Sequence, residues 1–322
     1  MEVGQEFATS PWRVQVTSPW LASCVCVIVL MIPRLAGAQP PSAGQEPMKS
    51  ATVGTRLVAY HLFGEDSPGT PLVLINGGPG FDHSFLHMST VWEGLAATRP
   101  VVFFDQPGTG QSWPVGAQDS LAVDDVLQSI EAVRIALNAS HLSLLGHSWG
   151  GYVALAYAVR YSERVERLVL VSSVAPRIAA TEFLFGALFP DVVANEKALS
   201  ADNPEHVQLW VRGRLWSSFY SPEVRDRVLA TLGRVPYNGR QETLLWRDAE
   251  SRDLTNDLSR LTTPVLILAG RFDANVAPRT AWSIHRAIPS SRLLVFERSG
   301  HFPFIEEPEL FFTAVDDFLR GR

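Results

Sequence analysis

The stretch of residues 142–151 constrains the fold of this chain more than any other. It begins with an apolar run, residues 142–145, which is typical of a buried strand, and a helical pattern over residues 152–161 follows it. Between the two lies Gly-His-Ser-Trp-Gly-Gly, with Ser148 at its centre. Glycines flank the serine because a Cβ atom there would collide with neighbouring backbone in a sharp turn. The order strand, tight turn, helix predicts that the Ser148 hydroxyl stands clear of the backbone and is available for chemistry.

Further apolar runs with the length of buried strands recur along the chain and alternate with helical patterns. The strand-like runs are residues 72–75, 100–104, 168–171, 264–269 and 292–296, and the helical patterns cover residues 124–137, 279–287 and 305–319. Such alternation implies right-handed crossover connections between parallel strands. We therefore expect an α/β fold built on a mostly parallel central sheet.

Residues 53–63 predict an early strand, and the Gly-, Asp-, Ser- and Pro-containing residues 64–71 predict a hairpin turn after it.

The predicted core is interrupted by a later segment with a different pattern. From residue 176 to 258, helix-like stretches rich in aromatic residues replace the short apolar runs. We expect residues 176–258 to form a helical cap inserted into a core of residues 48–175 and 259–322. The aromatic residues of this cap divide between pocket lining and core packing, and they are Phe183, Phe185, Phe189, Trp210, Trp216, Phe219, Tyr220 and Trp246.

The first 47 residues do not follow the pattern of the core. Residues 21–32 are almost wholly apolar, too few to span a bilayer comfortably, and Ala36-Gly37-Ala38 after them resembles a signal-peptidase site. We expect residues 1–38 to be a signal peptide and residues 39–47 a flexible lead-in. The protein would then be secreted or periplasmic, without stable membrane insertion once the signal is cleaved; the alternative is an uncleaved N-terminal anchor.

Composition excludes several classes of function. Of 322 residues, 46% are hydrophobic and 19% charged, the net charge is -6, and no basic cluster occurs, which argues against a nucleic-acid partner. Both cysteines, Cys24 and Cys26, lie in the N-terminal apolar segment. Neither metal-ligand spacing nor a dinucleotide-binding glycine motif is present. We expect no cofactor and no metal, and a small-molecule or short-peptide substrate.

A serine hydroxyl is a poor nucleophile at neutral pH unless a base and an orienting acid lie beside it. In open α/β sheets, the loops at the carboxyl ends of the strands meet at one crevice. Two further loops of this kind carry Asp273 and His301, so the chain order is Ser, Asp, His. We expect His301 to accept the Ser148 proton and Asp273 to orient His301. Asp105 and Asp124 are the rival acids.

A second glycine-rich loop follows the strand at residues 72–75. It reads Asn76-Gly77-Gly78-Pro79-Gly80, and it can bring backbone N–H groups close to a ligand without side chains in the way. We expect the N–H of Gly78, or of Gly77, to form an oxyanion hole with the N–H of Trp149. His147 is expected to point away from the hydroxyl of its neighbour, and the other histidines are expected to have surface or packing roles.

Residues 53–319 resemble the α/β-hydrolase superfamily, and within it the proline iminopeptidase-like serine hydrolases. The resemblance rests on Gly-Gly-Pro-Gly at residues 77–80, Asp-Gln-Pro-Gly-Thr-Gly-Gln-Ser at 105–112 and Gly-His-Ser-Trp-Gly-Gly at 146–151. It implies the α/β-hydrolase fold, a catalytic triad of Ser148, Asp273 and His301, and an acyl-enzyme. Asn76 stands where that family has His.

The resemblance implies release of N-terminal residues, with carboxylates of the cap holding the free amine of the substrate. The acidic cap residues match no motif and read as solvated helix charges; they are Glu182, Glu196, Glu205, Glu223, Glu242 and Glu250. A carboxylesterase or lactonase of the same fold is the first alternative. A non-catalytic small-molecule binder is the second. Dehalogenase or epoxide hydrolase chemistry is disfavoured, because those relatives have Asp in place of Ser148.

Overall fold

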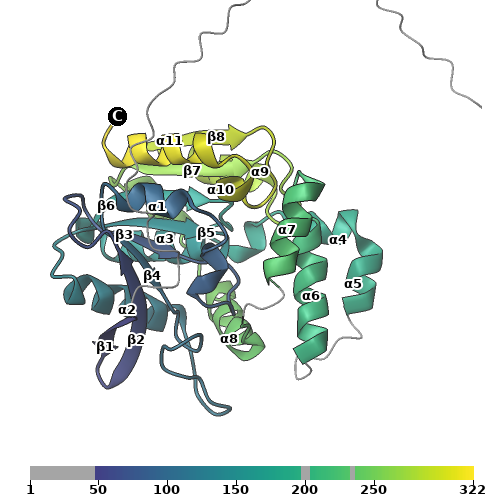
Figure 1. The fold of residues 1–322 in the computed structure, drawn as a ribbon, viewed down its shortest axis with the longest axis horizontal. Coiled ribbons are helices and arrows are strands. Elements are labelled where there is room, and N and C mark those ends of the chain that lie inside the picture. The colour runs from purple at the N-terminus through teal and green to yellow at the C-terminus, as the bar shows by residue number, and fades with distance from the viewer. Residues whose placement is uncertain (1–47, 197–203, 233–235) are drawn as a thin grey trace, which may run out of the picture. The chain divides into compact units, whose positions relative to one another are not determined.

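The computed structural model describes residues 48–196, 204–232 and 236–322. The predicted signal peptide and lead-in, residues 1–38 and 39–47, lie outside these ranges. One eight-stranded sheet forms the centre of the described fold (Figure 1), in the order β1-β2-β4-β3-β5-β6-β7-β8. Its strands are β1 (Lys49–Val53), β2 (Arg56–Phe63), β3 (Leu72–Ile75), β4 (Val101–Phe104), β5 (Leu142–His147), β6 (Val165–Val171), β7 (Val265–Gly270) and β8 (Ser291–Phe296).

The sheet is parallel from β4 to β8, and only β1 and β2 at one edge run antiparallel to their neighbours. The apolar runs LVLI of β3 and VVFF of β4 are fully buried, as strands covered on both faces must be. Register brings Ile75 at the end of β3 opposite Gly146 of β5. The loops that begin at Asn76 and Ser148 therefore leave the sheet side by side.

The beginning of the chain differs from the sequence-based prediction. The expected single strand over residues 53–63 is two strands, β1 and β2, joined by a tight turn in which Gly54 has a φ of 60°. The hairpin predicted at residues 64–71 is wrong, because β2 pairs with β4 and not with β3. Turn-forming residues identify a change of direction, whereas the partner of a strand depends on contacts far along the chain.

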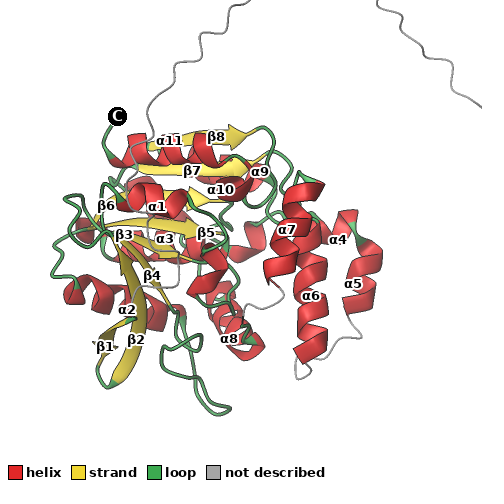
Figure 2. Cartoon of the chain, in the orientation of Figure 1, coloured by secondary structure: helices red, strands yellow, loops and turns green. Residues whose placement is uncertain are grey.

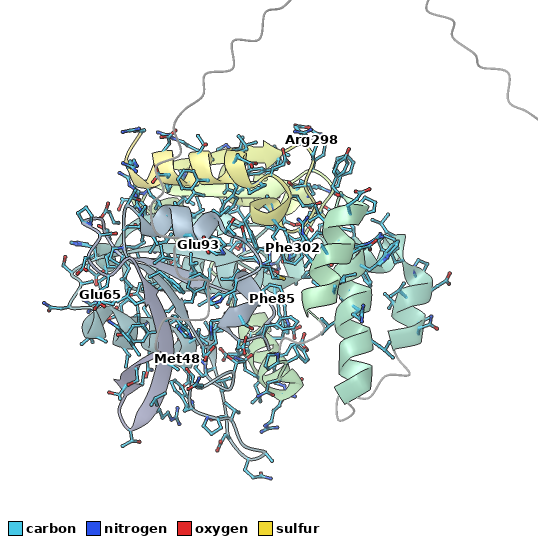
Figure 3. All side chains as sticks on the ribbon, viewed as in Figure 1. Met48, Glu65, Phe85, Glu93, Arg298 and Phe302 are labelled. Atoms are coloured by element: carbon cyan, nitrogen blue, oxygen red, sulfur yellow. The ribbon has the colours of Figure 1, made fainter. Side chains whose placement is uncertain are left out.

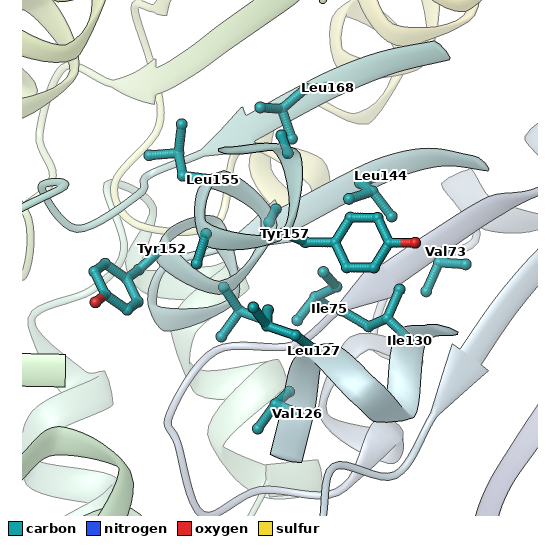
Figure 4. Close-up of a cluster of buried hydrophobic side chains, with 14 of the residues drawn as sticks. Val73, Ile75, Val126, Leu127, Ile130, Leu144, Tyr152, Leu155, Tyr157 and Leu168 are labelled. Atoms are coloured by element: carbon teal, nitrogen blue, oxygen red, sulfur yellow. The ribbon is translucent and has the colours of Figure 1, made fainter. Parts of the chain in front are cut away.

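Helices cover both faces of the sheet (Figure 2). They are α1 (Val91–Ala96), α2 (Val123–Ala136), α3 (Trp149–Arg160), α9 (Pro278–Ala287), α10 (Pro303–Glu306) and α11 (Pro308–Leu319). Alternate residues of β3 point to opposite layers, so Val73 and Ile75 pack in the layer of α2, α3 and α9, whereas Leu72 and Leu74 pack in that of α1 and α11. Figure 4 shows the first layer, in which Ile130 of α2 and Tyr157 of α3 lie beside Val73.

Among the described residues, five α-helices occur between β6 and β7, in the segment expected to form the cap. They are α4 (Phe185–Leu188), α5 (Pro190–Glu196), α6 (Pro204–Trp216), α7 (Pro222–Leu232) and α8 (Gly239–Glu250). In Figure 1, α4 to α7 gather together at one side of the sheet and α8 lies apart from them, where it contacts α2. Asn238, which caps α8, donates through its side chain to the main-chain oxygen of Gly108. This bond ties the start of α8 to the loop after β4.

Within the described ranges, every helix is too short or too polar to span a lipid bilayer. The same part of the chain contains no group of three or more His, Cys, Asp or Glu side chains placed to hold a metal ion.

Candidate active site

Ser148 sits in a strained turn between β5 and α3. Its φ of 57° and ψ of -118° lie in a region that residues with a side chain rarely adopt. The flanking glycines make this turn possible. A Cβ atom on Gly146 would lie 2.1 Å from the main-chain oxygen of Gly150, and one on Gly150 would lie 2.0 Å from that of Ile75. The predicted turn is therefore present, with the half-buried Ser148 at its apex.

Asp273 and His301 come from the loops after β7 and β8 and meet as predicted. The Nδ1 atom of His301 lies 2.7 Å from Oδ2 of Asp273, and the two residues are 5% and 2% exposed. The other oxygen of Asp273 accepts the backbone N–H groups of Asn275 and Val276, each at 2.9 Å. A carboxylate with these donors is held in one orientation, and it fixes the proton of the imidazole on Nδ1.

Ser148 and His301 line one cavity of about 320 Å³. Within the described part of the chain, the Ser148 hydroxyl makes no hydrogen bond to the ring of His301. Such a bond is often long in the absence of substrate and tightens in the Michaelis complex. Asp273 is therefore in direct contact with His301, and Ser148 and His301 line the same cavity.

The two expected oxyanion donors belong to segments next to the serine. Gly78 lines the cavity and has a φ of 120°, and a Cβ atom on the preceding Gly77 would lie 3.0 Å from Cβ of Ser148. Trp149 is the first residue of α3, so its N–H has no partner within the helix. Among the described residues, neither the Gly78 N–H nor the Trp149 N–H donates a hydrogen bond. Both are available to a developing negative charge.

The rival acids have other partners. Asp105 accepts the ring Nδ1–H and the backbone N–H of His83 and the N–H of Gln111. Burial alone would raise the pKa of Asp105, but these hydrogen bonds lower it below its usual value. Asp124 pairs with Arg160 and Arg252. Neither of these aspartates is among the described residues that line the cavity.

His147 is fully buried beside the candidate base. Its Nε2 atom lies 2.9 Å from the main-chain oxygen of His301, so this nitrogen carries the proton and donates it there. Burial lowers the pKa of His147 well below its usual value, and the nearby His301 lowers it further. A neutral imidazole thus supports the backbone of the loop that carries His301.

One glutamate of the cap differs from the solvated charge that the sequence predicts. Glu242 of α8 is half-buried and lines the cavity together with Arg214 of α6. The hydroxyl of Tyr237 donates to its carboxylate. Burial raises the pKa of Glu242, although the Tyr237 hydrogen bond and the charge of Arg214 oppose the rise. The sequence feature that could have revealed this position of Glu242 is its spacing from Trp246, which lies one helical turn later and lines the same cavity.

Most of the cavity wall is apolar. Figure 3 marks Phe85 and Phe302 on the side of the sheet that faces α6 and α7, and both line the cavity. Of the cap aromatics, Trp246 and the largely exposed Phe183 also line it, Phe185 is buried, and Trp216 and Tyr220 are exposed without lining it. The side chain of Trp210 lies outside the described residues. The expected division between pocket and packing is present, with a third, exposed group.

Three histidines that matched no pattern lie together near Asp105. The rings of His61 and His83 are 4.5 Å apart, and those of His83 and His87 are 5.1 Å apart. Burial lowers the pKa of His87 to about 4, and the two neighbouring histidines contribute to the decrease. Asp105 links the cluster to the loop after β4 through its bonds with His83. The three come from β2 and from the segment after β3, so sequence spacing does not reveal their proximity.

Comparison with known proteins supports the fold described above. A family model described as "alpha/beta hydrolase fold" matches residues 70–308. A proline iminopeptidase of Heyndrickxia coagulans is 29% identical over 82% of this chain and 95% of its own. A pimeloyl-[acyl-carrier protein] methyl ester esterase of Neisseria meningitidis is 30% identical over 77% of this chain and 92% of its own. Among solved structures, an esterase from Thermogutta terrifontis superposes with a TM-score of 0.65 at 23% identity, covering 86% of this chain and 98% of that protein.

Proposed function

Since the chain belongs to the family of α/β-hydrolase fold enzymes, we propose that it cleaves its substrate through an acyl-enzyme formed on Ser148. The observation that carries this proposal is the hydrogen bond between His301 and Asp273 at the wall of the cavity that Ser148 also lines. A nucleophile, a base and an orienting acid in this arrangement are what acyl transfer requires.

In the proposed reaction, Nε2 of His301 accepts the hydroxyl proton of Ser148 as Oγ attacks the carbonyl carbon of the substrate. The electron pair of the C=O bond moves to its oxygen, which the N–H groups of Gly78 and Trp149 hold. Collapse of this intermediate breaks the bond to the leaving group, and His301 returns the proton to it. Water then attacks the acyl-enzyme with His301 again as base, which releases the acid product and restores Ser148.

Asp273 acts through His301 in this scheme. The imidazolium that forms during each step is stabilised by a carboxylate 2.7 Å away. The backbone N–H groups of Asn275 and Val276 keep that carboxylate in place.

For the substrate, we propose a short peptide or aminoacyl amide with a free N-terminus, as in the relatives named proline iminopeptidase. The half-buried carboxylate of Glu242 supports this, because it can accept the α-ammonium group inside the cavity. The cavity volume of about 320 Å³ is at the lower end of ligand sites. It suits one residue on the acyl side of the scissile bond.

A carboxylesterase or lactonase is the second candidate, and Arg214 is the observation that favours it. This cation lines the same cavity as Glu242 and its charge acts on the Glu242 carboxylate, so it competes with a substrate ammonium for that group. The rest of the wall is largely apolar, which also suits the acyl chain of an ester or the ring of a lactone.

Three substrates separate these candidates when they are tested on the full chain. They are prolyl 4-nitroanilide, its N-acetyl derivative and 4-nitrophenyl butyrate. The aminopeptidase predicts turnover of the first and loss of turnover on N-acetylation. Hydrolysis of the ester without the anilide supports the esterase and contradicts the peptidase. A protein that turns over none of them and resists a fluorophosphonate is a binder.

For the N-terminus, we propose export by a signal peptide that ends at Ala38. The apolar run of residues 21–32 and the small residues after it support this proposal. N-terminal sequencing of the protein recovered outside the cytoplasm is expected to begin at Gln39. A mature protein that keeps residues 21–32 supports the anchored alternative.

A further inference from the structure

A chain of buried hydrogen bonds connects the two loops that carry the proposed oxyanion donors. The indole N–H of Trp149 donates to Oε1 of Gln106 at 3.2 Å. Nε2 of Gln106 donates in turn to the main-chain oxygen and to Oδ1 of Asn76, at 3.1 and 3.2 Å. Gln106 and Trp149 are 0% exposed and Asn76 is 1% exposed. The side chain of Gln106, in the loop after β4, therefore connects the loop after β3 to the start of α3.

The amide of Asn76 continues the chain into the glycine-rich loop. Its Nδ2 donates to the main-chain oxygens of Gly77 and Phe81, at 3.0 and 2.9 Å. These two residues bracket Gly78. The bonds therefore hold the loop at both ends of the segment that carries the proposed donor.

Donors and acceptors alternate along this chain without conflict. Oε1 of Gln106 faces a donor, and its Nε2 faces two acceptors. Turning either amide over would place like groups together in a site without solvent, where an unpaired polar group costs on the order of 1–3 kcal/mol. The orientation of both amides is therefore determined by their partners.

We propose that Gln106 is a positioning residue that fixes the distance between the N–H of Gly78 and the N–H of Trp149. The proposal rests on the acyl-transfer function proposed above. Oxyanion donors act only when they lie about 2.7–3.1 Å from the oxygen as it becomes charged. The backbones that bear the two donors come from different elements, and the Asn76–Gln106–Trp149 chain is the described side-chain link between them.

The direct test compares Gln106→Met with Gln241→Met in the full chain, using 4-nitrophenyl butyrate, which has no amine. Both glutamines are fully buried, and Nε2 of Gln241 donates to the main-chain oxygen of Pro107, next to Gln106. The control thus removes a matched bond to the same loop without touching the oxyanion donors. Active sites are counted by the endpoint of fluorophosphonate labelling, so that kcat is expressed per folded molecule.

We expect Gln106→Met to lower kcat by roughly tenfold to a hundredfold, less than the loss of a donor itself, with KM within about twofold. Gln241→Met is expected to keep kcat within about twofold of the parent. Equal kcat values for Gln106→Met and the parent overturn the proposal. An equal decrease in both variants also overturns it, since packing alone would then explain the effect.

Binding of a tetrahedral mimic supplies a readout that a purely structural role would not change. Butylboronic acid forms an anionic adduct with the serine and needs both donors, whereas butyrate, the product, does not. Gln106→Met should weaken the binding of the boronic acid by about the same factor as it lowers kcat. It should leave the binding of butyrate unchanged. Equal weakening of both ligands contradicts the proposal.

If Gln106→Met does not fold, Asn76→Asp tests the same chain. It replaces the Nδ2 donor by an acceptor that faces the oxygens of Gly77 and Phe81, and the same loss of kcat is expected. Failure of the underlying function is a separate result, because the parent would then neither hydrolyse the ester nor be labelled by a fluorophosphonate.

Discussion

His301 and Asp273 lie 28 residues apart in the sequence, yet Nδ1 of the first is 2.7 Å from Oδ2 of the second. The pair is buried at the carboxyl ends of the neighbouring strands β7 and β8. Parallel strands bring these loops to one edge of the sheet, and the bond then fixes the tautomer of the imidazole. The Nε2 atom of His301 is left as the proton acceptor that Ser148 requires.

Asp273→Asn should lower kcat by about 10⁴-fold with little change in KM, because the amide stabilises the wrong tautomer of His301 and no imidazolium. Steady-state kinetics on the best substrate measure the effect. Asp124→Asn is the matched control, since Asp124 pairs with Arg160 and Arg252, and its activity should be unchanged. A loss of less than about tenfold in Asp273→Asn argues against its proposed role.

Glu242→Gln should raise KM at least about tenfold for prolyl 4-nitroanilide and leave 4-nitrophenyl butyrate unaffected. The reason is that the amide keeps the shape of the side chain but loses the charge that pairs with the ammonium. Kinetics with both substrates on both proteins measure the difference. If the anilide and the ester are affected equally, Glu242 supports the cavity wall and does not recognise the amine.

The pH dependence of this recognition follows from the same residue. Burial raises the pKa of Glu242, so protonation removes its charge at a higher pH than the usual 4.5. The ratio of kcat/KM for the anilide to that for the ester should therefore fall as the pH decreases. Effects of pH that are common to both substrates cancel in the ratio. Tyr237→Phe removes a donor that lowers this pKa, so the fall should shift to higher pH; a ratio independent of pH contradicts the assignment.

Folding stability should decrease between pH 6.5 and about 4 because of His87. Its pKa is lowered from 6.5 to about 4 in the folded state by burial and by the neighbouring His83 and His61, whereas the charge of Asp105 opposes the decrease. The unfolded chain therefore binds this proton first, and the contribution to stability, complete above pH 6.5, is lost as the pH falls. We expect a loss of about 1–3 kcal/mol, reduced for partial exposure of the ring. Urea unfolding of His87→Leu should show a weaker pH dependence than the parent; an unchanged slope contradicts the prediction.

Gly150→Ala should prevent folding or destabilise the protein by several kcal/mol. Its Cβ atom would lie 2.0 Å from the main-chain oxygen of Ile75, and neither backbone can move without displacing the sheet. Gly186→Ala in α4 is the control, because a Cβ atom there meets nothing within 4 Å. That control should be neutral or more stable by up to about 1 kcal/mol. Thermal unfolding distinguishes the two; similar Tm values in both variants contradict the account of the turn.

The sheet and the positions of Ser148, Asp273 and His301 could be predicted from the sequence for one physical reason. Buried parallel strands leave continuous apolar runs, and the residue after each run lies at one edge of the sheet. Chemistry-bearing residues that follow such runs are therefore brought together whatever separates them in the chain. The glycines around Ser148 were predictable because backbone crowding leaves no alternative.

Glu242 and the cluster of His61, His83 and His87 could not be predicted in this way. A helical glutamate reads as solvated unless the packing of its helix is known, and α8 turns Glu242 toward the cavity through contacts at Asn238 and Gly108. The pairing of β2 with β4 is equally non-local. These features depend on how distant elements pack, and local pattern does not encode that.

The most direct test of the account is labelling of the full chain by a fluorophosphonate, followed by mass spectrometry of the labelled peptide. We predict one adduct per molecule, on Ser148, and at least a thousandfold slower labelling of the folded His301→Gln variant, on the order of the loss expected without the base. An unlabelled but folded parent, or an adduct on another serine, would contradict the central claim that Ser148 is the nucleophile activated by His301.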